Sequence, residues 1–290
     1  MTFTQLEIFS MLARIGSFSR AASALGITQS AVSHALKQLE ADLGVCLFSR
    51  GPTAVELTEV GVKLLLRAND ILQQKEALHQ EACYEQGIAR GTLRIASFGA
   101  SSSLHVLPHL LACYRQTHPE VEVLIDEGVD SEVAQWLLER RVELGSVILP
   151  DERFDVLPVA EDELVAVLPA GHRLAVCSSV SASDFHGLPF IRTAAGSGPH
   201  VDQFLAAAGA TPKTLFRFEQ LSSMLGFVAQ GVAVTIAGRL ALPEPPEGVI
   251  YRSLEPRRPR EIALAALNFE RLSPAAQAFL RIARKMHRKK

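Results

Sequence analysis

Two short amphipathic runs joined at a glycine occupy residues 17–44, and they restrict what this part of the chain can form. Ser19 is expected to cap a short helix, and Gly26 is placed to end it in the left-handed conformation. Thr28 is expected to cap a second helix that keeps its apolar residues at helical spacing, and Gly44 to end that helix. The sequence therefore predicts two short helices separated by a tight turn.

Further elements flank this helix pair. Apolar residues at helical spacing predict one helix over residues 2–14 and a long one from Thr58 to about Gln86. Between them, Gly51-Pro52 is a turn signal with a short apolar run on each side, which predicts a small β-hairpin or wing over Cys46–Thr58. We therefore expect a compact helical domain over residues 1–58, a long helix over 59–87 and a separate domain over 91–290.

After Gly91 the pattern changes to alternating strands and helices, which is typical of βα units with mostly parallel sheets. Two such halves suggest two lobes. We place lobe I at about 91–160 and lobe II at about 163–260. The tail, 261–290, supplies one more strand and a final helix.

The two short helices differ in their exposed chemistry. In a helix-turn-helix, the second helix lies in the major groove of DNA and the first supports it. The second helix here carries amide, hydroxyl and basic side chains, and glutamine pairs naturally with adenine. The alternative is a solvated face of a small helical cap, and local charge does not separate the two, because residues 1–67 hold six Lys and Arg against five Asp and Glu.

Composition excludes several classes of protein. The 290 residues have a formal net charge of -2, so any nucleic-acid binding must use a local surface. Four cysteines without CxxC spacing argue against a zinc site or a disulfide framework and fit a reducing cytoplasm. No basic signal-peptide region opens the chain, and Gln230 and Arg239 interrupt its most apolar stretch, so we expect neither export nor a membrane span.

Sequence patterns of catalysis are incomplete. Residues 99–103 lack the final glycine of a nucleophile elbow, and residues 196–201 lack the third glycine of a dinucleotide loop. His105 and His109 are four residues apart but lack the glutamate of a zinc-protease helix. We therefore expect no enzyme, no metal and no cofactor.

The string AASALGITQSAVSHALKQLEADLGVCLFSR, followed by LTEVG, resembles the LysR-type transcriptional regulators. RGTLRIAS, LPHLLACYRQTHPEVEV and LVAVLPAGHRLA extend the likeness over the whole chain. The resemblance implies an α/β protein with an N-terminal winged helix-turn-helix, a long linker helix and a two-lobed effector domain similar to periplasmic binding proteins. It also implies that the tail returns to lobe I.

The resemblance implies that a set of residues near the helix pair contacts DNA. The set is Ser19, Arg20, Thr28, Gln29, Ser30, Ser33, His34, Lys37 and Arg50. Many relatives have arginine in place of His34 and basic residues in place of Thr53 and Glu56. We therefore expect fewer phosphate contacts and a shallow dependence of DNA binding on salt.

The resemblance also implies a homodimer or homotetramer formed through the linker helix, with Leu64, Ile71 and Leu78 as the dimerisation stripe. Packing of that stripe on the chain's own first helix is the alternative. A helix of about 28 residues reaches about 42 Å, which is too long for that packing alone.

A small-molecule effector is expected between the two lobes. Serines at a strand-to-helix turn suit an organic anion, although simple helix capping would also explain them. The candidate residues are Ser101, Ser102, Ser103, Thr193, Gly196, Ser197, Gln220 and Ser222. Residues 119–165 hold fourteen Asp and Glu against three Lys and Arg, which fits a solvated face better than a cationic effector.

Taken together, the sequence predicts a cytoplasmic transcription regulator that binds operator DNA and an effector, and that acts through RNA polymerase. The competing hypothesis is a small-molecule-binding or assembly protein whose N-terminal helices do not read DNA. An assembly helix would have no need of the side chains on Gln29–Ser33, which favours the regulator.

Overall fold

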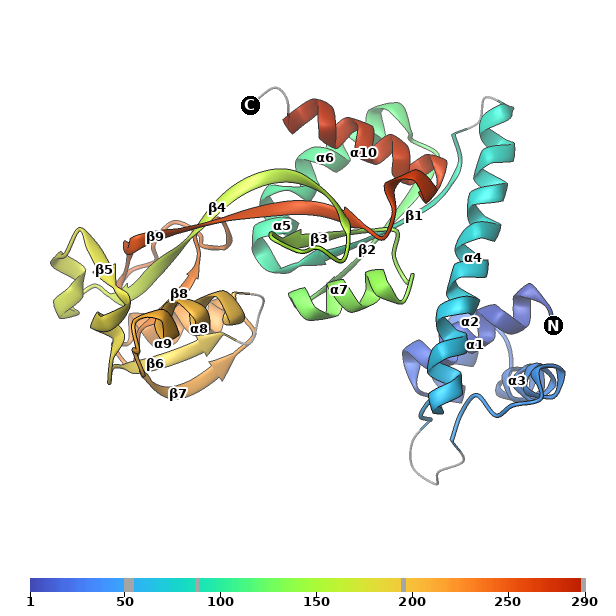
Figure 1. Ribbon diagram of the computed structural model, residues 1–290, viewed down its shortest axis with the longest axis horizontal. Coiled ribbons are helices and arrows are strands. Elements are labelled where there is room, and N and C mark those ends of the chain that lie inside the picture. The colour runs from blue at the N-terminus through green and yellow to red at the C-terminus, as the bar shows by residue number, and fades with distance from the viewer. Residues whose placement is uncertain (50–54, 87–88, 194–196, 288–290) are drawn as a thin grey trace.

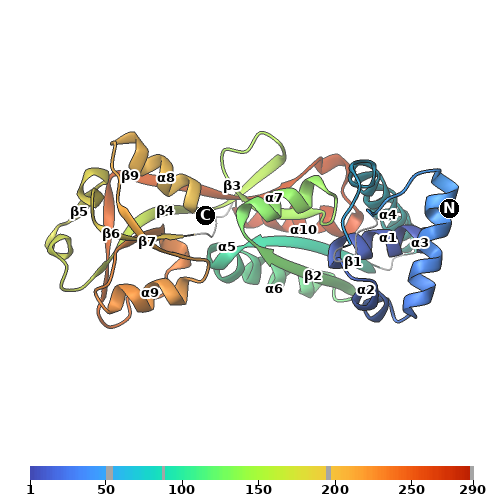
Figure 2. The ribbon, with the colours of Figure 1, turned by 90° about the horizontal axis from the view of Figure 1, so that it is seen from below.

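The computed structural model describes residues 1–49, 55–86, 89–193 and 197–287. The molecule is elongated, with a helical N-terminal domain at one end, lobe I in the middle and lobe II at the other end (Figures 1 and 2). The long helix α4 (Glu59–Glu85) stands between the N-terminal domain and lobe I.

Three helices build the N-terminal domain, namely α1 (Phe3–Ile15), α2 (Phe18–Leu25) and α3 (Gln29–Leu43). The Thr28 hydroxyl accepts a hydrogen bond from the Ala31 amide, and Gly26 and Gly44 end their helices at φ 66° and φ 70°, as predicted. The expected cap at Ser19 is wrong. Ser17 caps α2, because the helix begins at Phe18, whose ring packs against the domain core.

The base of the predicted hairpin is present. Phe48 and Leu57 form an antiparallel bridge, and the Ser49 amide donates to the Glu56 carbonyl at 2.8 Å. The Thr58 hydroxyl then caps α4 by accepting from the Gly61 amide. The turn itself, with Arg50, lies outside the described residues.

Lobe I has a sheet with helices on both faces. Strands β1 (Gly91–Phe98), β2 (Val121–Gly128) and β3 (Leu144–Ile148) are parallel. Helices α6 (Leu107–Thr117) and α10 (Pro274–His287) lie on one face, and α7 (Asp130–Leu138) lies on the other (Figure 1). The short helix α5 (Gly99–His105) follows β1 directly.

Two long antiparallel strands join lobe I to lobe II, namely β4 (Asp155–Pro169) and β9 (Val249–Ala266). The other elements of lobe II are β5 (Ser179–Ser181), β6 (Pro189–Thr193), α8 (Gly198–Ala207), β7 (Lys213–Phe218), α9 (Leu221–Ala229) and β8 (Thr235–Gly238), with short 3-10 turns at Arg173–Val176, Ala182–Phe185, Arg239–Ala241 and, in lobe I, Phe269–Arg271. Separate buried clusters fill lobe I and lobe II.

The expectation of mostly parallel sheets is wrong for the main sheet. Its seven strands run in the order β2-β1-β3-β9-β4-β8, with β5 paired to β9, and β9 is antiparallel to both β3 and β4. The physical reason is that the chain enters lobe II along β4 and returns along β9, so the two crossings run side by side in opposite directions. The C-terminal part of β9 pairs with β3 in lobe I.

Candidate DNA interface and effector site

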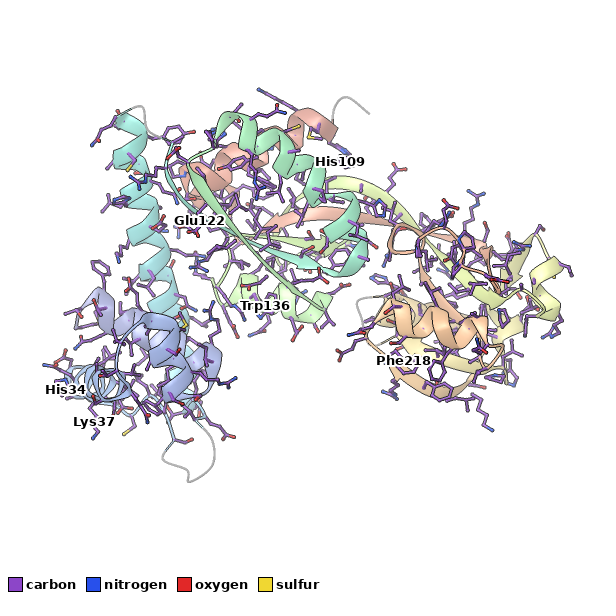
Figure 3. All side chains as sticks on the ribbon, turned by 180° about the vertical axis from the view of Figure 1, so that it is seen from behind. His34, Lys37, His109, Glu122, Trp136 and Phe218 are labelled. Atoms are coloured by element: carbon purple, nitrogen blue, oxygen red, sulfur yellow. The ribbon has the colours of Figure 1, made fainter. Side chains whose placement is uncertain are left out.

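Helix α3 presents its polar residues outward. Val32, Leu36 and Leu39 are buried and hold the helix on the domain core. Thr28, Gln29, Ser30, His34 and Lys37 are exposed, and Ser33 is half-buried. His34 and Lys37 point away from the rest of the molecule (Figure 3). The structure therefore leaves the predicted base-reading side chains free to meet DNA.

The two predicted residues on α2 have local partners. The Ser19 and Ser17 hydroxyls are 3.2 Å apart, and the Arg20 guanidinium donates to the Ile15 carbonyl at 2.7 Å. Both side chains remain exposed. Arg20 is thus oriented by the turn before α2, which limits the positions its charge can reach.

Glu40 was missed by sequence reasoning. Its carboxylate on α3 accepts from the Leu47 amide at 2.6 Å and from the Phe48 amide at 3.4 Å. These hydrogen bonds connect the first strand of the hairpin to α3, the helix expected to read DNA. The available signal was an acidic residue near the end of α3, shortly before the hairpin.

The proposed dimerisation stripe on α4 divides into two parts. Leu64 packs against the N-terminal core, as the alternative interpretation of the stripe held. Ile71 and Leu78, in contrast, are 39% and 69% exposed. An apolar side chain that exposed on a long helix is available to a second copy of the chain.

The three serines of α5 have different partners. The Ser102 hydroxyl meets Ser146 inside lobe I, and the Ser103 hydroxyl donates to Glu127 at 2.6 Å. Ser101 is buried, and its hydroxyl accepts from Arg260 at 3.3 Å. Of the three, Ser101 is therefore the one directed toward the junction between the lobes.

Arg260 is the centre of that junction. On β9, its guanidinium forms an ion pair with Asp162 of β4, with an Nη2–Oδ2 distance of 2.5 Å. Nη1 donates to the hydroxyl of Ser197, which precedes α8 in lobe II, at 3.0 Å. One side chain therefore contacts both crossing strands, lobe I through Ser101 and lobe II through Ser197.

The guanidinium is closely packed on the side that faces Gly238. At Gly238, an added Cβ would lie 1.8 Å from the Arg260 Nη2 atom, so only glycine fits there. Asp162 is also held from behind, because its Oδ1 atom accepts from the amides of Glu163 and Leu240 at 2.8 and 2.9 Å. The ion pair is thus fixed in position by the fold.

The other expected effector residues differ in their placement. Thr193 is buried at the end of β6, and Gly196 lies outside the described residues. Gln220 and Ser222 are exposed at the start of α9, and no contact joins them to Arg260 among the hydrogen bonds of the described residues. Ser101 and Ser197 are thus the expected residues that meet at Arg260.

A hollow of about 1130 Å³ lies beside the ion pair. Asp162 and Arg260 form part of its wall, together with Leu149, Pro150 and Phe154. Its volume is in the range that accommodates a small molecule. Its walls also carry acidic residues, namely Asp151, Glu152, Glu161, Glu163 and Glu261.

Asp130, at the first turn of α7, is an unusual acid near the same junction. Its Oδ1 atom is buried without a hydrogen-bond partner among the described residues. Burial raises the pKa of Asp130 to about 6, and the positive charge of Arg260 opposes this shift. Burial also lowers the pKa of His200 on α8, and Arg260 lowers it further.

Arg260 and Asp162 were not predicted from the sequence. Arg260 ends the charged run EPRRPR, which resembles a solvated loop when it is read by composition. Strand alternation was the available signal, because it places Arg260 on the same face as Ile262 and Leu264, which are both fully buried. That signal depends on knowing that β9 is one continuous strand.

Comparisons with known proteins agree with this arrangement. Residues 3–62 match the bacterial regulatory helix-turn-helix protein, lysR family, and residues 86–288 match the LysR substrate binding domain. The uncharacterized HTH-type transcriptional regulator YvbU of Bacillus subtilis is 31% identical over 99% of each chain.

Two solved structures share the fold. CbnR complexed with its target DNA has a TM-score of 0.64 at 21% identity, over 99% of this chain and 100% of that one. The effector binding domain of QuiR in complex with shikimate has a TM-score of 0.61 at 23% identity, over 69% of this chain and 98% of that one.

The described residues contain neither a helix able to cross a membrane nor a group of three or more side chains suited to a metal ion. A winged helix-turn-helix with an exposed reading helix is therefore joined through a long helix to a two-lobed substrate-binding domain. The chain belongs to the LysR family of DNA-binding transcriptional regulators.

Proposed function

We propose that this regulator senses an organic acid that binds between the lobes at Arg260. The observation that carries the proposal is the guanidinium itself, which contacts Ser101 in lobe I and Ser197 in lobe II. A carboxylate placed there would exchange two hydroxyl acceptors for a charged one, and charge-assisted hydrogen bonds are about twice as strong as neutral ones. Effector binding would therefore change how the lobes are held together.

Binding then alters DNA affinity through the oligomer. The exposed Ile71 and Leu78 of α4 support a homodimer. Two such dimers associate to form a homotetramer. Two half-sites of an operator are read by two α3 helices, with Gln29 and Lys37 among the contacts. We propose that the assembled protein works in the cytoplasm, acts on RNA polymerase and has no catalytic activity of its own.

A cationic effector is the second candidate, and a specific observation favours it. Five carboxylates line the hollow in addition to Asp162, against Arg239, Arg257 and Arg260. Asp162 is already paired, and it neutralises much of the charge of Arg260. The experiment must therefore separate acids from amines.

The test begins with selection of genomic DNA fragments by the purified protein and sequencing of those retained. The genes beside the recovered sites nominate small molecules, and each carboxylic acid is titrated beside the amine of the same carbon skeleton. We expect an acid to change operator affinity at least fivefold, and Ser197→Ala to weaken its effect by about 1 kcal/mol. A response to amines alone would support the cationic effector and reject the organic acid.

A further inference from the structure

A second cavity, of about 460 Å³, lies where the N-terminal domain meets lobe I. We call it the joint cavity. Helices α1 and α4 form one side, and β1 with the segment after α7 forms the other. Its lining includes Met11, Arg14, Leu72, Arg94 and Arg141. Both domains therefore contribute walls, and the cavity is distinct from the hollow beside Arg260.

Hydrogen bonds between the domains frame the joint cavity. The Asn69 amide donates to the Glu139 carbonyl at 2.7 Å, and the Gln73 amide donates to the Arg140 carbonyl at 2.8 Å. Arg140 also pairs with Asp70 at 3.2 Å. These contacts hold α4 against lobe I, so the walls of the cavity keep a defined spacing.

Besides Arg140, which pairs with Asp70, three arginines from the two domains line this cavity. Arg14 lies in the last turn of α1, Arg94 on β1 and Arg141 after α7. Burial lowers the pKa of Arg14, and the like charges of Arg141 and Arg94 lower it further, while Asp126 opposes them. Arg14 is thus close enough to Arg94 and Arg141 for their like charges to disfavour its own.

The carboxylates in the lining are already engaged by other groups. Glu7 pairs with Lys75 at 2.7 Å, and Glu76 accepts from the Thr92 amide at 3.0 Å. Glu139 accepts from Gln135 at 2.7 Å. Among the hydrogen bonds of the described residues, none joins these acids to Arg14, Arg94 or Arg141.

The remaining acid, Glu143, accepts two hydrogen bonds from Ser273; burial raises its pKa, while these hydrogen bonds and the charge of Arg94 lower it. Arg141 has Asp126 at 3.3 Å. In the part of the chain that the structure describes, Arg14 and Arg94 have no carboxylate within ion-pair distance, although Asp126 acts on Arg14 and Glu143 on Arg94 from further away. Two guanidinium groups without a direct ion pair therefore line one cavity from opposite domains.

The joint cavity also has apolar walls, formed by Met11, Leu65 and Leu72 among others. Its volume exceeds what a simple inorganic ion needs and falls within the range of small-molecule sites. We propose that the joint cavity binds an organic anion, with its charged group between Arg14 and Arg94 and its apolar body against Met11 and Leu72. Planar guanidinium groups suit both carboxylate and phosphate oxygens.

Such a ligand would link the DNA-binding domain to lobe I directly. Arg14 moves with α1, and Arg94 moves with the strand that leads to α5 and the effector site. An anion held by both relieves their mutual repulsion and favours the arrangement in which the domains are docked. Occupancy of the joint cavity therefore sets the orientation of the reading helices independently of the effector.

Phenyl phosphate is the probe, because it combines a compact anion with an apolar ring. Calorimetric titration of the full-length protein is expected to show binding that is at least tenfold tighter than that of inorganic phosphate or phenol. Arg14→Gln and Arg94→Gln should each weaken the binding of phenyl phosphate at least tenfold. The matched control, Arg115→Gln on the exposed surface of α6, should leave it unchanged, as should Ser101→Ala at the effector site.

Three results would overturn the proposal: no binding of phenyl phosphate to the wild-type protein, equal affinity in the Arg14 and Arg115 variants, or phenol binding as tightly as phenyl phosphate. Loss of binding in Ser101→Ala alone would place the ligand in the effector site and would also reject the joint cavity. Arg94 is exposed, so Arg94→Gln is expected to fold and to keep the test decisive if Arg14→Gln is unstable.

Discussion

Arg260 and Asp162 form an ion pair between the two strands that join the lobes, and their side chains are only 5% and 0% exposed. A buried pair of this kind is costly to break, because the remaining charge cannot return to water. The pair therefore positions one guanidinium between Ser101 and Ser197 at a stability cost that the fold tolerates. It is the feature through which the lobes and the hinge strands contact one another.

Removing one member of the pair should be strongly destabilising. We expect Arg260→Met to lower the free energy of unfolding by about 3–5 kcal/mol, because Asp162 is left buried and unpaired. Urea denaturation measures this change. Lys63→Met is the control, since its pair with Glu59 is exposed and contributes less than about 0.5 kcal/mol. Similar losses in both variants would contradict the structural role of Arg260.

Because Asp130 is buried, we expect the stability gained by replacing it with asparagine to depend on pH. Its folded-state pKa is raised to about 6, so the charged carboxylate disfavours the folded state, and this penalty grows as pH rises from about 4 through about 6. Asp130→Asn should therefore be more stable than wild type by about 1–2 kcal/mol at neutral pH and equal to it near pH 4.

The matched control for Asp130 is Asp151→Asn. The hydrogen bond from Arg153 lowers the pKa of Asp151, so the charged form is favoured in the folded protein. That substitution should lower stability at neutral pH, with the difference fading as pH falls through the lowered pKa. Thermal melts of both variants at several pH values give the comparison, and a gain from Asp130→Asn at every pH would reject electrostatics as the cause.

Gln29 should read a base. Replacing it by alanine is expected to cost about 1–3 kcal/mol on the specific operator and to relax preference at one base pair. Fluorescence anisotropy with matched specific and random duplexes provides the measurement. Gln38→Ala, an exposed amide further along α3, serves as the control. An equal loss on both duplexes from Gln29→Ala would point to a backbone contact instead.

The salt dependence of DNA binding should be shallow and should respond to His34. Residues 1–67 carry a formal charge of only +1, from six Lys and Arg against five Asp and Glu. His34→Arg is expected to steepen the slope of log affinity against log salt by about 1, because it adds one phosphate contact. A slope of about 8–10 for the wild type would show that the phosphate contacts are far more numerous than proposed.

The exposed part of α4 should carry the dimer. Leu78→Asp places a charge in the proposed interface and is expected to shift the protein to monomers in sedimentation velocity runs at micromolar concentration. Val176→Asp is the control, because Val176 is 90% exposed and ends the 3-10 turn Arg173–Val176 of lobe II rather than lying on α4. Unchanged sedimentation of the Leu78 variant would move the interface elsewhere.

Local physical chemistry allowed much of the N-terminal domain to be predicted. Thr28, Gly26 and Gly44 mark helix ends through interactions within a few residues, so the two short helices and their turn follow from the sequence. The long helix α4 follows from its apolar spacing. Ser19 was misjudged because two serines stand close together, and packing of Phe18 decides which of them caps α2.

The exposed residues of α3 were also predictable, because amphipathic spacing alone tells which side of a helix faces the core. The site between the lobes was not. Its central residue, Arg260, meets Asp162, Ser197 and Ser101 at sequence separations of 98, 63 and 159 residues. No local pattern encodes contacts over such distances.

The sequence by itself therefore determined the reading helix, its caps and the order of the domains, since each depends on neighbouring residues. Only the tertiary structure decided which charges meet. Antiparallel pairing of β4 with β9 places Asp162 opposite Arg260, and docking of α1 near β1 gathers Arg14 and Arg94 at one cavity. These contacts arise from the path of the chain through space, because electrostatic energy depends on distance in the folded molecule rather than on position in the sequence.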